Sequence, residues 1–176
     1  KLHYISFTGK NENKDTRPIL EITLNINDKK LKIYNVHFPS GFYDVSMRLD
    51  SLNKLRDLLK SHQHPSIALG DFNINSKEDK KFNIYKSEET DWLVSHLNGC
   101  KNCKGTHYYA YDKSWSFLDA IFLSKDRGIR YIPDSINVHS TPTNSYNDTG
   151  RPIRFNPIEK DGVSDHLPIV AKFEFD

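Results

Sequence analysis

The sequence predicts a single globular domain that combines β-strands with α-helices. Apolar and polar residues alternate from Leu20 to Ile26, which is the pattern of a strand with one face toward water. Between Asp44 and Ser61, apolar residues recur at spacings of three and four, as in an amphipathic helix. The apolar run that ends at Leu69 does not alternate, which predicts a strand buried on both sides. A chain of 176 residues, 36% of them hydrophobic, suffices for one core.

The first elements of the chain form a predicted β-hairpin. Residues 1–16 are polar and are expected to hold one short strand followed by a loop. A strand over residues 19–26 and a second over residues 31–38 are joined by the turn-forming sequence Asn-Asp-Lys-Lys. Pro39 ends the second strand, because proline cannot donate a ladder hydrogen bond. His37 therefore lies at the end of this strand.

The middle of the chain alternates charged and apolar segments. The mixed charges of residues 77–86 indicate an exposed surface loop. Residues 87–98 are expected to form a second helix that ends at Gly99. The apolar run 117–123 predicts a strand interrupted by Asp119. A carboxylate in so apolar a segment needs hydrogen bonds or a charged partner.

The last part of the chain ends in a strand preceded by an acid and an imidazole. Residues 125–160 are rich in loops, with a brief strand at residues 136–139. The sequence Ser-Asp-His-Leu-Pro then leads into an apolar strand over residues 169–175. Asp165 is suited to hold a cation and His166 to move a proton. A polar turn before an edge strand is the alternative interpretation.

Composition places few limits on function. Lys and Arg number 25 against 23 Asp and Glu, so the net charge of +2 gives only a weak attraction to anions. The sequence contains no apolar run of the roughly 18 residues that cross a bilayer. The protein is therefore expected to be soluble, whether secreted or cytoplasmic.

Two cysteines form the motif Cys100-Lys101-Asn102-Cys103. A local disulfide is the first interpretation and a pair of reduced thiols the second. Zinc is the third, because it would require further ligands, for which His96 and His107 offer the nearest nitrogen atoms.

Four polar motifs stand at the ends of predicted strands. They are Asn35-Val36-His37, Gly70-Asp71-Phe72-Asn73, Leu118-Asp119-Ala120-Ile121 and Ser164-Asp165-His166-Leu167-Pro168-Ile169. In this order they resemble the motifs of the endonuclease/exonuclease/phosphatase superfamily, also called DNase I-like. The resemblance covers essentially the whole chain. It implies an α+β fold, a two-sheet sandwich flanked by helices, with the site at the mouth between the sheets.

The resemblance also implies a role for each catalytic residue. His166 would be the general base, or would relay the proton of the attacking water, and Asp119 would orient its imidazole. Asp71 and Asn73 would position the nucleophile and hold the phosphate. His37 would stabilise negative charge on the phosphoryl oxygens.

A metal and further phosphate ligands complete the expected site. Asp165 and Asp71 would hold the ion, and such oxygen ligands suit magnesium, or manganese, better than zinc. Asn35, Arg48 and Arg154 are secondary candidates for binding the substrate phosphate. For the two arginines, an ordinary exposed surface is the alternative interpretation.

The chain departs from the family pattern on its N-terminal side. The metal-binding glutamate of the family, and the asparagine before it, have no counterpart before Asn35. Residues 1–176 are therefore expected to be one domain, the C-terminal part of an endonuclease/exonuclease/phosphatase domain without its N-terminal strands. The missing segment would be supplied in cis or by a second chain, and this polypeptide alone would be weakly active.

The resemblance implies a magnesium-dependent phosphodiesterase, and an endonuclease or exonuclease is the first candidate. Nucleic acid is favoured over lipid as the substrate. Hydrolysis of phospholipid, sphingolipid or another small phosphoester is the alternative within the same fold. A non-catalytic binding module derived from such an enzyme is the third interpretation. The sequence argues against it, because both His166 and Asp119 are present.

Overall fold

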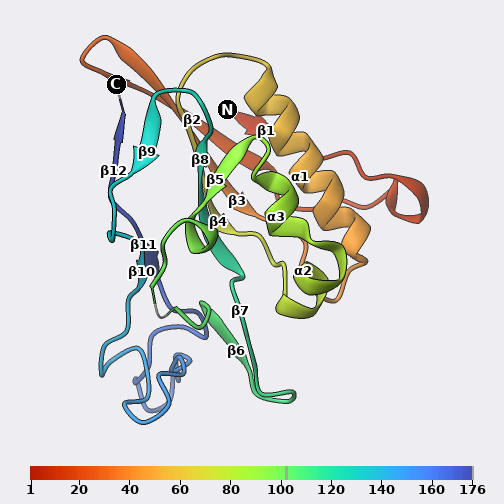
Figure 1. Ribbon diagram of the computed structural model, residues 1–176. Helices are drawn as coiled ribbons and strands as arrows, with labels where there is room; N and C mark the ends of the chain where they lie inside the picture. Colours follow the sequence, from red (N-terminus) through yellow and green to blue (C-terminus); the bar gives the residue numbers. More distant parts are fainter. Residues whose placement is uncertain (102, 176) are drawn as a thin grey trace.

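The computed structural model describes residues 1–101 and 103–175, and this part of the chain is built on a six-stranded sheet (Figure 1). In spatial order the strands are β1 (Leu2–His3), β2 (Ile19–Ile26), β3 (Lys29–His37), β4 (Ser66–Asp71), β8 (Asp119–Ser124) and β5 (Trp92–Val94). Strands β3 and β4 are parallel and are connected by helix α1 (Val45–Lys60). The other neighbours in the sheet are antiparallel. The predicted α+β class is confirmed.

The β2–β3 hairpin closes as the sequence predicts. Its turn residues, Asn27 and Asp28, both have positive φ angles, of 51° and 63°. Asn and Asp tolerate this left-handed backbone better than most residues, and it matches the twist of the paired strands. The turn aligns Ile22 with Ile33, so the alternating apolar side chains of the two strands share one face.

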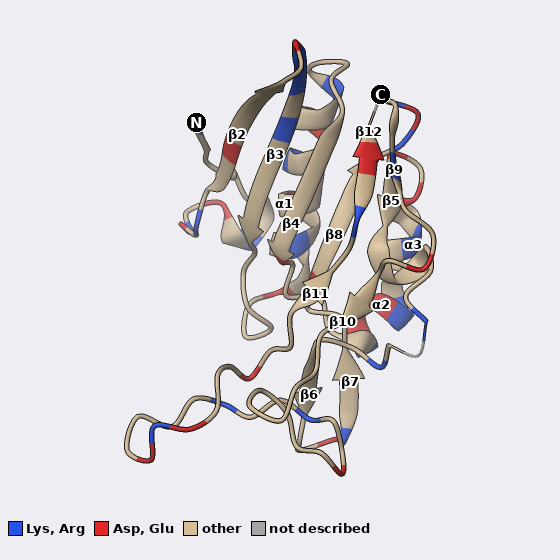
Figure 2. Ribbon diagram, turned by 90° about the vertical axis from the view of Figure 1, so that its left-hand side faces the viewer, with Lys and Arg blue, Asp and Glu red and all other residues tan. Residues whose placement is uncertain are grey.

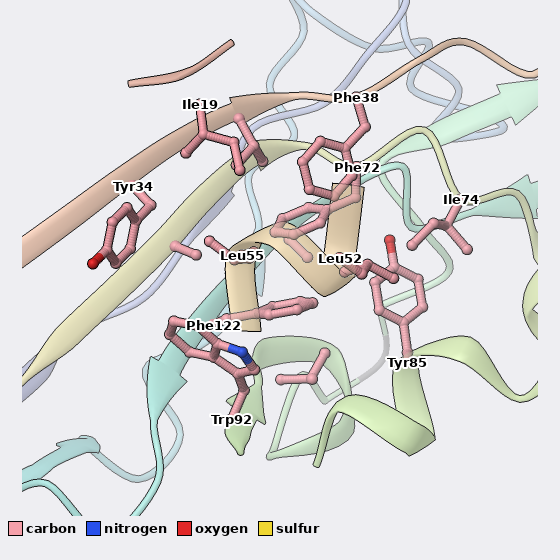
Figure 3. Close-up of a cluster of buried hydrophobic side chains, with 14 of the residues drawn as sticks. Ile19, Tyr34, Phe38, Leu52, Leu55, Phe72, Ile74, Tyr85, Trp92 and Phe122 are labelled. Atoms are coloured by element: carbon pink, nitrogen blue, oxygen red, sulfur yellow. The ribbon is translucent and has the colours of Figure 1, made fainter. Parts of the chain in front are cut away.

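The main core lies between the sheet and the helices (Figure 3). The side chain of Asp44 accepts a hydrogen bond from the amide of Ser46 and so caps α1. Rings and aliphatic side chains from α1, from α3 and from five strands and the residues that follow them then fill the space. They include Ile19, Tyr34, Phe38, Leu52, Leu55, Phe72, Trp92 and Phe122.

Two predictions for residues 76–98 are wrong. The expected loop at residues 77–86 contains helix α2 (Ser76–Phe82), which Asn75 caps, and most of helix α3 (Ile84–Glu88). The expected helix at residues 87–98 contains instead the end of α3, strand β5 and a 3-10 turn at Ser95–Leu97. Pairing with β8 buries alternate residues of β5 in the core, and this tertiary contact overrides the helical pattern.

Two short ribbons cover part of the opposite face of the sheet (Figure 1). Strand β9 (Ile129–Tyr131) pairs with β12 (Phe173–Phe175), and β10 (Asn137–Val138) pairs with β11 (Ile169–Val170). The predicted strand at residues 136–139 is thus confirmed as β10. The predicted strand over residues 169–175 is divided, because its two halves pair with different partners.

The β2 side of this second face stays open. Figure 2 looks onto it: β11 and β12 lie near β8, whereas no helix or strand of the described residues lies in front of β2 and β3. Apolar side chains therefore remain 38 to 41% exposed along β2. They are Leu20, Ile22, Leu24 and Ile26.

The remaining elements are small. A 3-10 turn spans Gly9–Asn11, and the hairpin of β6 (His107–Tyr109) and β7 (Ser114–Ser116) extends beyond the end of the sheet (Figure 1). Cys100 and Cys103 form a disulfide, the first of the three states considered for this motif. In the described part of the chain, every helix is too short or too polar to cross a membrane.

Candidate functional site

Three of the predicted site residues form a row across neighbouring strands. His37 ends β3, Asp71 ends β4 and Asp119 begins β8. The parallel register pairs His37 with Asp71, and the antiparallel register pairs Asp71 with Asp119. Because directly paired residues point to the same side of a sheet, all three side chains lie on the face away from α1.

His166 joins this row from the loop that precedes β11. Its Nδ1 lies 2.7 Å from Oδ2 of Asp119. An ionised carboxylate only accepts hydrogen bonds, which assigns the proton to Nδ1. The hydrogen bond to Asp119 raises the pKa of His166, and burial of the ring opposes this shift. Asp119, the carboxylate within the apolar run 117–123, therefore has the hydrogen-bond partner that a partly buried carboxylate requires.

Thr106 holds the His166 loop against β8. Its carbonyl oxygen accepts a hydrogen bond of 2.7 Å from the amide of Leu167. Its hydroxyl oxygen accepts one of 3.1 Å from the amide of Asp119. The amide of His166 donates in turn to the hydroxyl of Ser164, at 3.1 Å. The backbone on both sides of the imidazole–carboxylate pair is therefore fixed.

Asp71 lies between a hydrogen-bond donor and a histidine. Its Oδ1 accepts the amide of Asn73 at 2.8 Å, and its Oδ2 lies 3.6 Å from Nε2 of His37. Burial and the neighbouring carboxylate of Asp119 raise the pKa of Asp71, although the Asn73 amide and the two histidines oppose this. Two partly desolvated carboxylates side by side favour a cation between them.

Gly70 allows β3 and β4 to approach closely beside the site. Its φ of +134° is unfavourable for other residues, and a Cβ atom there would lie 2.1 Å from the carbonyl oxygen of Val36. The glycine of the Gly-Asp-Phe-Asn motif is therefore a steric requirement of the strand that carries Asp71.

The row can hold a metal ion. Asp71, Asp119 and His166 each offer one ligand atom, and these atoms lie within 4.8 Å of one another. Burial and repulsion from Asp119 raise the pKa of Asp71, and a bound cation would oppose both effects. Asp165, the other predicted metal ligand, is exposed and lies outside this trio in the described structure.

A cleft of about 510 Å³ opens beside the row. It contains the predicted residues Asn73, Asp165 and His166. Loop residues before α1, the start of α2 and the β6–β7 hairpin form its other walls. These further residues include Ser40, Phe42, Asn75, Lys77, His107, Tyr109, Asp112, Ser114 and Ser116.

Arg48 does not reach the site, so its prediction as a phosphate ligand is corrected. Its guanidinium is fully buried and pairs with the carboxylate of Glu78. It also donates to the carbonyl oxygens of three residues in the loop between β3 and α1, Pro39, Ser40 and Tyr43. A guanidinium with these partners is structural, and it fixes that loop.

The other two secondary candidates lie apart from the row formed by His37, Asp71 and Asp119. Asn35 is exposed, two residues before His37 and therefore on the same face of β3. Arg154 is exposed in the long loop before β11 and does not belong to the described lining of the cleft.

His107 is a site residue that the four motifs do not contain. Its ring centroid lies 5.0 Å from that of His166, and the two residues form an isolated β-bridge. Burial lowers the pKa of His107, and the charge of His166 lowers it further. The only sequence signal for this position is the high aromatic content of residues 107–117, and such a segment can lie in a hydrophobic core or line a cleft equally well.

Comparison with solved structures identifies proteins with the same fold. The sequence matches no protein-family model and no curated protein. Among solved structures, an endonuclease/exonuclease/phosphatase family protein from Leptotrichia buccalis is 19% identical, with a TM-score of 0.67 over 99% of this chain and 60% of that one. TDP2 from D. rerio, solved with a single-strand DNA product, is 18% identical, with a TM-score of 0.65 over 99% of this chain and 67% of that one.

A third similar structure has a different stated activity. The mannosyl-6-phosphatase Bt3783 from Bacteroides thetaiotaomicron is 16% identical, with a TM-score of 0.56 over 99% of this chain and 65% of that one. The chain thus spans about three fifths to two thirds of the length of these proteins. These structural similarities show that the chain has the fold of the endonuclease/exonuclease/phosphatase, or DNase I-like, superfamily.

Proposed function

We propose that this chain carries the proton-transfer residues of a metal-dependent phosphodiesterase. An endonuclease or exonuclease is the first candidate activity. The observation that supports this proposal most is the hydrogen bond between Asp119 and His166 beside the carboxylate of Asp71. With its Nδ1 proton bound to a carboxylate, the imidazole has Nε2 left to take a proton from water. A base held in this way can activate a water molecule for attack on a phosphodiester.

The neighbouring groups supply the other needs of the reaction. His37 is half exposed and close to Asp71, where a protonated ring can donate to a phosphoryl oxygen. Asn73 is held by two hydrogen bonds: its backbone N–H donates to the carboxylate of Asp71, and its side-chain NH₂ donates to the carbonyl oxygen of Phe38. We assign it to positioning the phosphate.

Magnesium, or manganese, is the proposed cofactor. Asp71 would hold it directly, and Asp165 is the second proposed ligand because it lines the same cleft as His166. A bound divalent ion neutralises the negative charge that develops on the phosphoryl oxygens. Asp119 is committed to His166, so we assign it to orienting the base.

A nucleic-acid substrate is favoured by the similar D. rerio protein, which was solved with a single-strand DNA product. A sugar phosphate is the second candidate, because another similar structure is a mannosyl-6-phosphatase. We also propose that a further segment, in cis or from a second chain, covers the open face of β2. The exposed apolar side chains there support this proposal.

The test is hydrolysis by the intact protein with magnesium present. Bis(4-nitrophenyl) phosphate, single-stranded DNA and mannose 6-phosphate would be compared, with the variant Asp119→Asn as control. We expect both diesters to be cleaved, and cleavage to fall by at least about 100-fold in the variant. Equal rates in the two proteins, or cleavage of the monoester alone, would overturn the proposal.

A further inference from the structure

The cleft beside His166 has aromatic side chains on two of its walls. Phe42 comes from the loop between β3 and α1, and Tyr109 comes from β6. Phe42 is 102% exposed and Tyr109 is 52% exposed. Exposed rings that line a cleft mark surfaces that can gain apolar contact when a ligand binds.

The loop that carries Phe42 is held in place from beneath. The buried guanidinium of Arg48 donates to the carbonyl oxygens of Ser40 and Tyr43, on either side of Phe42. Glu78 fixes that guanidinium in turn. The ring is therefore presented on an ordered backbone, so binding to it loses little conformational entropy.

The rest of the lining selects a neutral, polar-edged group. The hydroxyl of Ser40 and the side-chain NH₂ group of Asn75, whose oxygen caps α2, can donate hydrogen bonds in the cleft. The hydroxyls of Ser114 and Ser116 add polar surface, although they already bind Asp112 and the amide of Ser76. Asp112 and Asp165 disfavour a second anion there, and the one lysine in the described lining, Lys77, lies 2.5 Å from Asp112. An acyl chain would gain nothing from these polar groups. A volume of about 510 Å³ is within the range of small-ligand sites.

We propose that this cleft binds the nucleobase next to the scissile phosphate, with Phe42 and Tyr109 as its stacking surfaces. The inference rests on the proposed function, since it assigns a part of the same substrate. A base is flat, neutral and polar at its edges, and stacks on aromatic side chains largely without regard to sequence. The row of His37, Asp71 and Asp119 then holds the phosphate, and the cleft holds the base beside it.

Binding measured apart from hydrolysis tests the subsite. A fluorescein-labelled, single-stranded phosphorothioate oligothymidylate and an abasic strand of the same length would be titrated with the intact protein by fluorescence anisotropy. We expect the base-bearing strand to bind at least about fivefold more tightly. Phe42→Ala and Tyr109→Ala should each reduce that preference and leave the affinity for the abasic strand unchanged.

Control variants distinguish stacking in the cleft from a general effect of removing an exposed aromatic side chain. Phe155→Ala removes a phenylalanine that is also exposed but does not line the cleft, and it should keep the full preference. Phe42→Trp should keep or increase it. Equal affinity of wild type for the two strands, or a preference that survives both alanine substitutions, would overturn the subsite. Displacement of the strand by mannose 6-phosphate at lower concentration than by thymidine 5′-monophosphate would assign the cleft to a sugar and also overturn it.

Failure of this inference can be told from failure of the proposed function. If the protein cleaves bis(4-nitrophenyl) phosphate but shows no preference for bases, the subsite is wrong and the phosphodiesterase stands. If it prefers bases but cleaves no diester, the subsite stands and the phosphodiesterase is wrong.

Discussion

The imidazole of His166 and the carboxylate of Asp119 form a hydrogen bond of 2.7 Å although 47 positions separate them in the chain. One residue begins a central strand and the other lies in the loop before β11. Thr106, from a third segment, binds the backbone beside both. This hydrogen bond depends on three separate segments of the chain and therefore exists only in the folded domain. Its effect on the pKa of His166 and on catalysis reports directly on the proposed site.

The titration of His166 should depend on Asp119. The hydrogen bond to the carboxylate favours the charged imidazolium, so the pKa of His166 should exceed the ordinary value of about 6.5. Asp119→Asn removes that stabilisation, and the pKa should fall. Titration of the metal-free protein followed by NMR of the ring protons measures both values. An unchanged pKa in the variant would show that Asp119 does not act on the ring.

Activity should require a divalent ion held by Asp71. Excess chelator should abolish hydrolysis, and magnesium or manganese should restore it. Asp71→Asn should raise the magnesium concentration needed for half-maximal activity about tenfold or more, since one charged ligand is lost. Asp28→Asn, in the exposed turn of the β2–β3 hairpin, is the matched control and should change nothing. Full activity in chelator would contradict the metal proposal.

The two faces of β2 should differ in their contribution to stability. Ile19 is 1% exposed against the helices, whereas Ile22 is 41% exposed on the open face. Ile19→Ala should lower the free energy of unfolding by about 2–4 kcal/mol, and Ile22→Ala by less than about 1 kcal/mol. Urea denaturation of residues 1–176 measures both. A similar loss at the two positions would mean that the second face is covered.

Arg48 should be needed for stability and should not bind substrate directly. Arg48→Ala leaves the partly buried Glu78 and three loop carbonyls without their donor, so unfolding should become easier by about 2–4 kcal/mol. Arg154→Ala, at an exposed position, should change stability little. A rise in KM without any loss of stability in Arg48→Ala would restore Arg48 as a phosphate ligand.

Much of the fold follows from local sequence patterns. The β2–β3 hairpin and α1 are predicted because their periodicity and their turn and cap residues agree with their final environment. Strand β5 is not predicted, because its conformation depends on pairing with β8 and not on its own propensities. The division of the last predicted strand has the same origin, since it depends on β9 and β10.

The candidate site is predictable where it is carried by short motifs. His37, Asp71 and Asp119 are found because each ends or begins a recognisable strand. Thr106 and His107 are missed because they act through contacts with distant segments. Arg48 was misplaced for a different reason. A guanidinium is a typical phosphate ligand, but α1 directs this side chain under the loop between β3 and α1, where it binds backbone carbonyl oxygens.

A double-mutant cycle on Asp119 and His166 tests directly whether the two residues act as one unit. Hydrolysis of bis(4-nitrophenyl) phosphate by the intact protein with magnesium would be measured for wild type, Asp119→Asn, His166→Ala and the double variant. If the two residues act as one unit, each single substitution lowers kcat by about 10²- to 10⁴-fold, and the double variant is hardly slower than the slower single one. Losses that multiply in the double variant would contradict the claim that Asp119 works through His166.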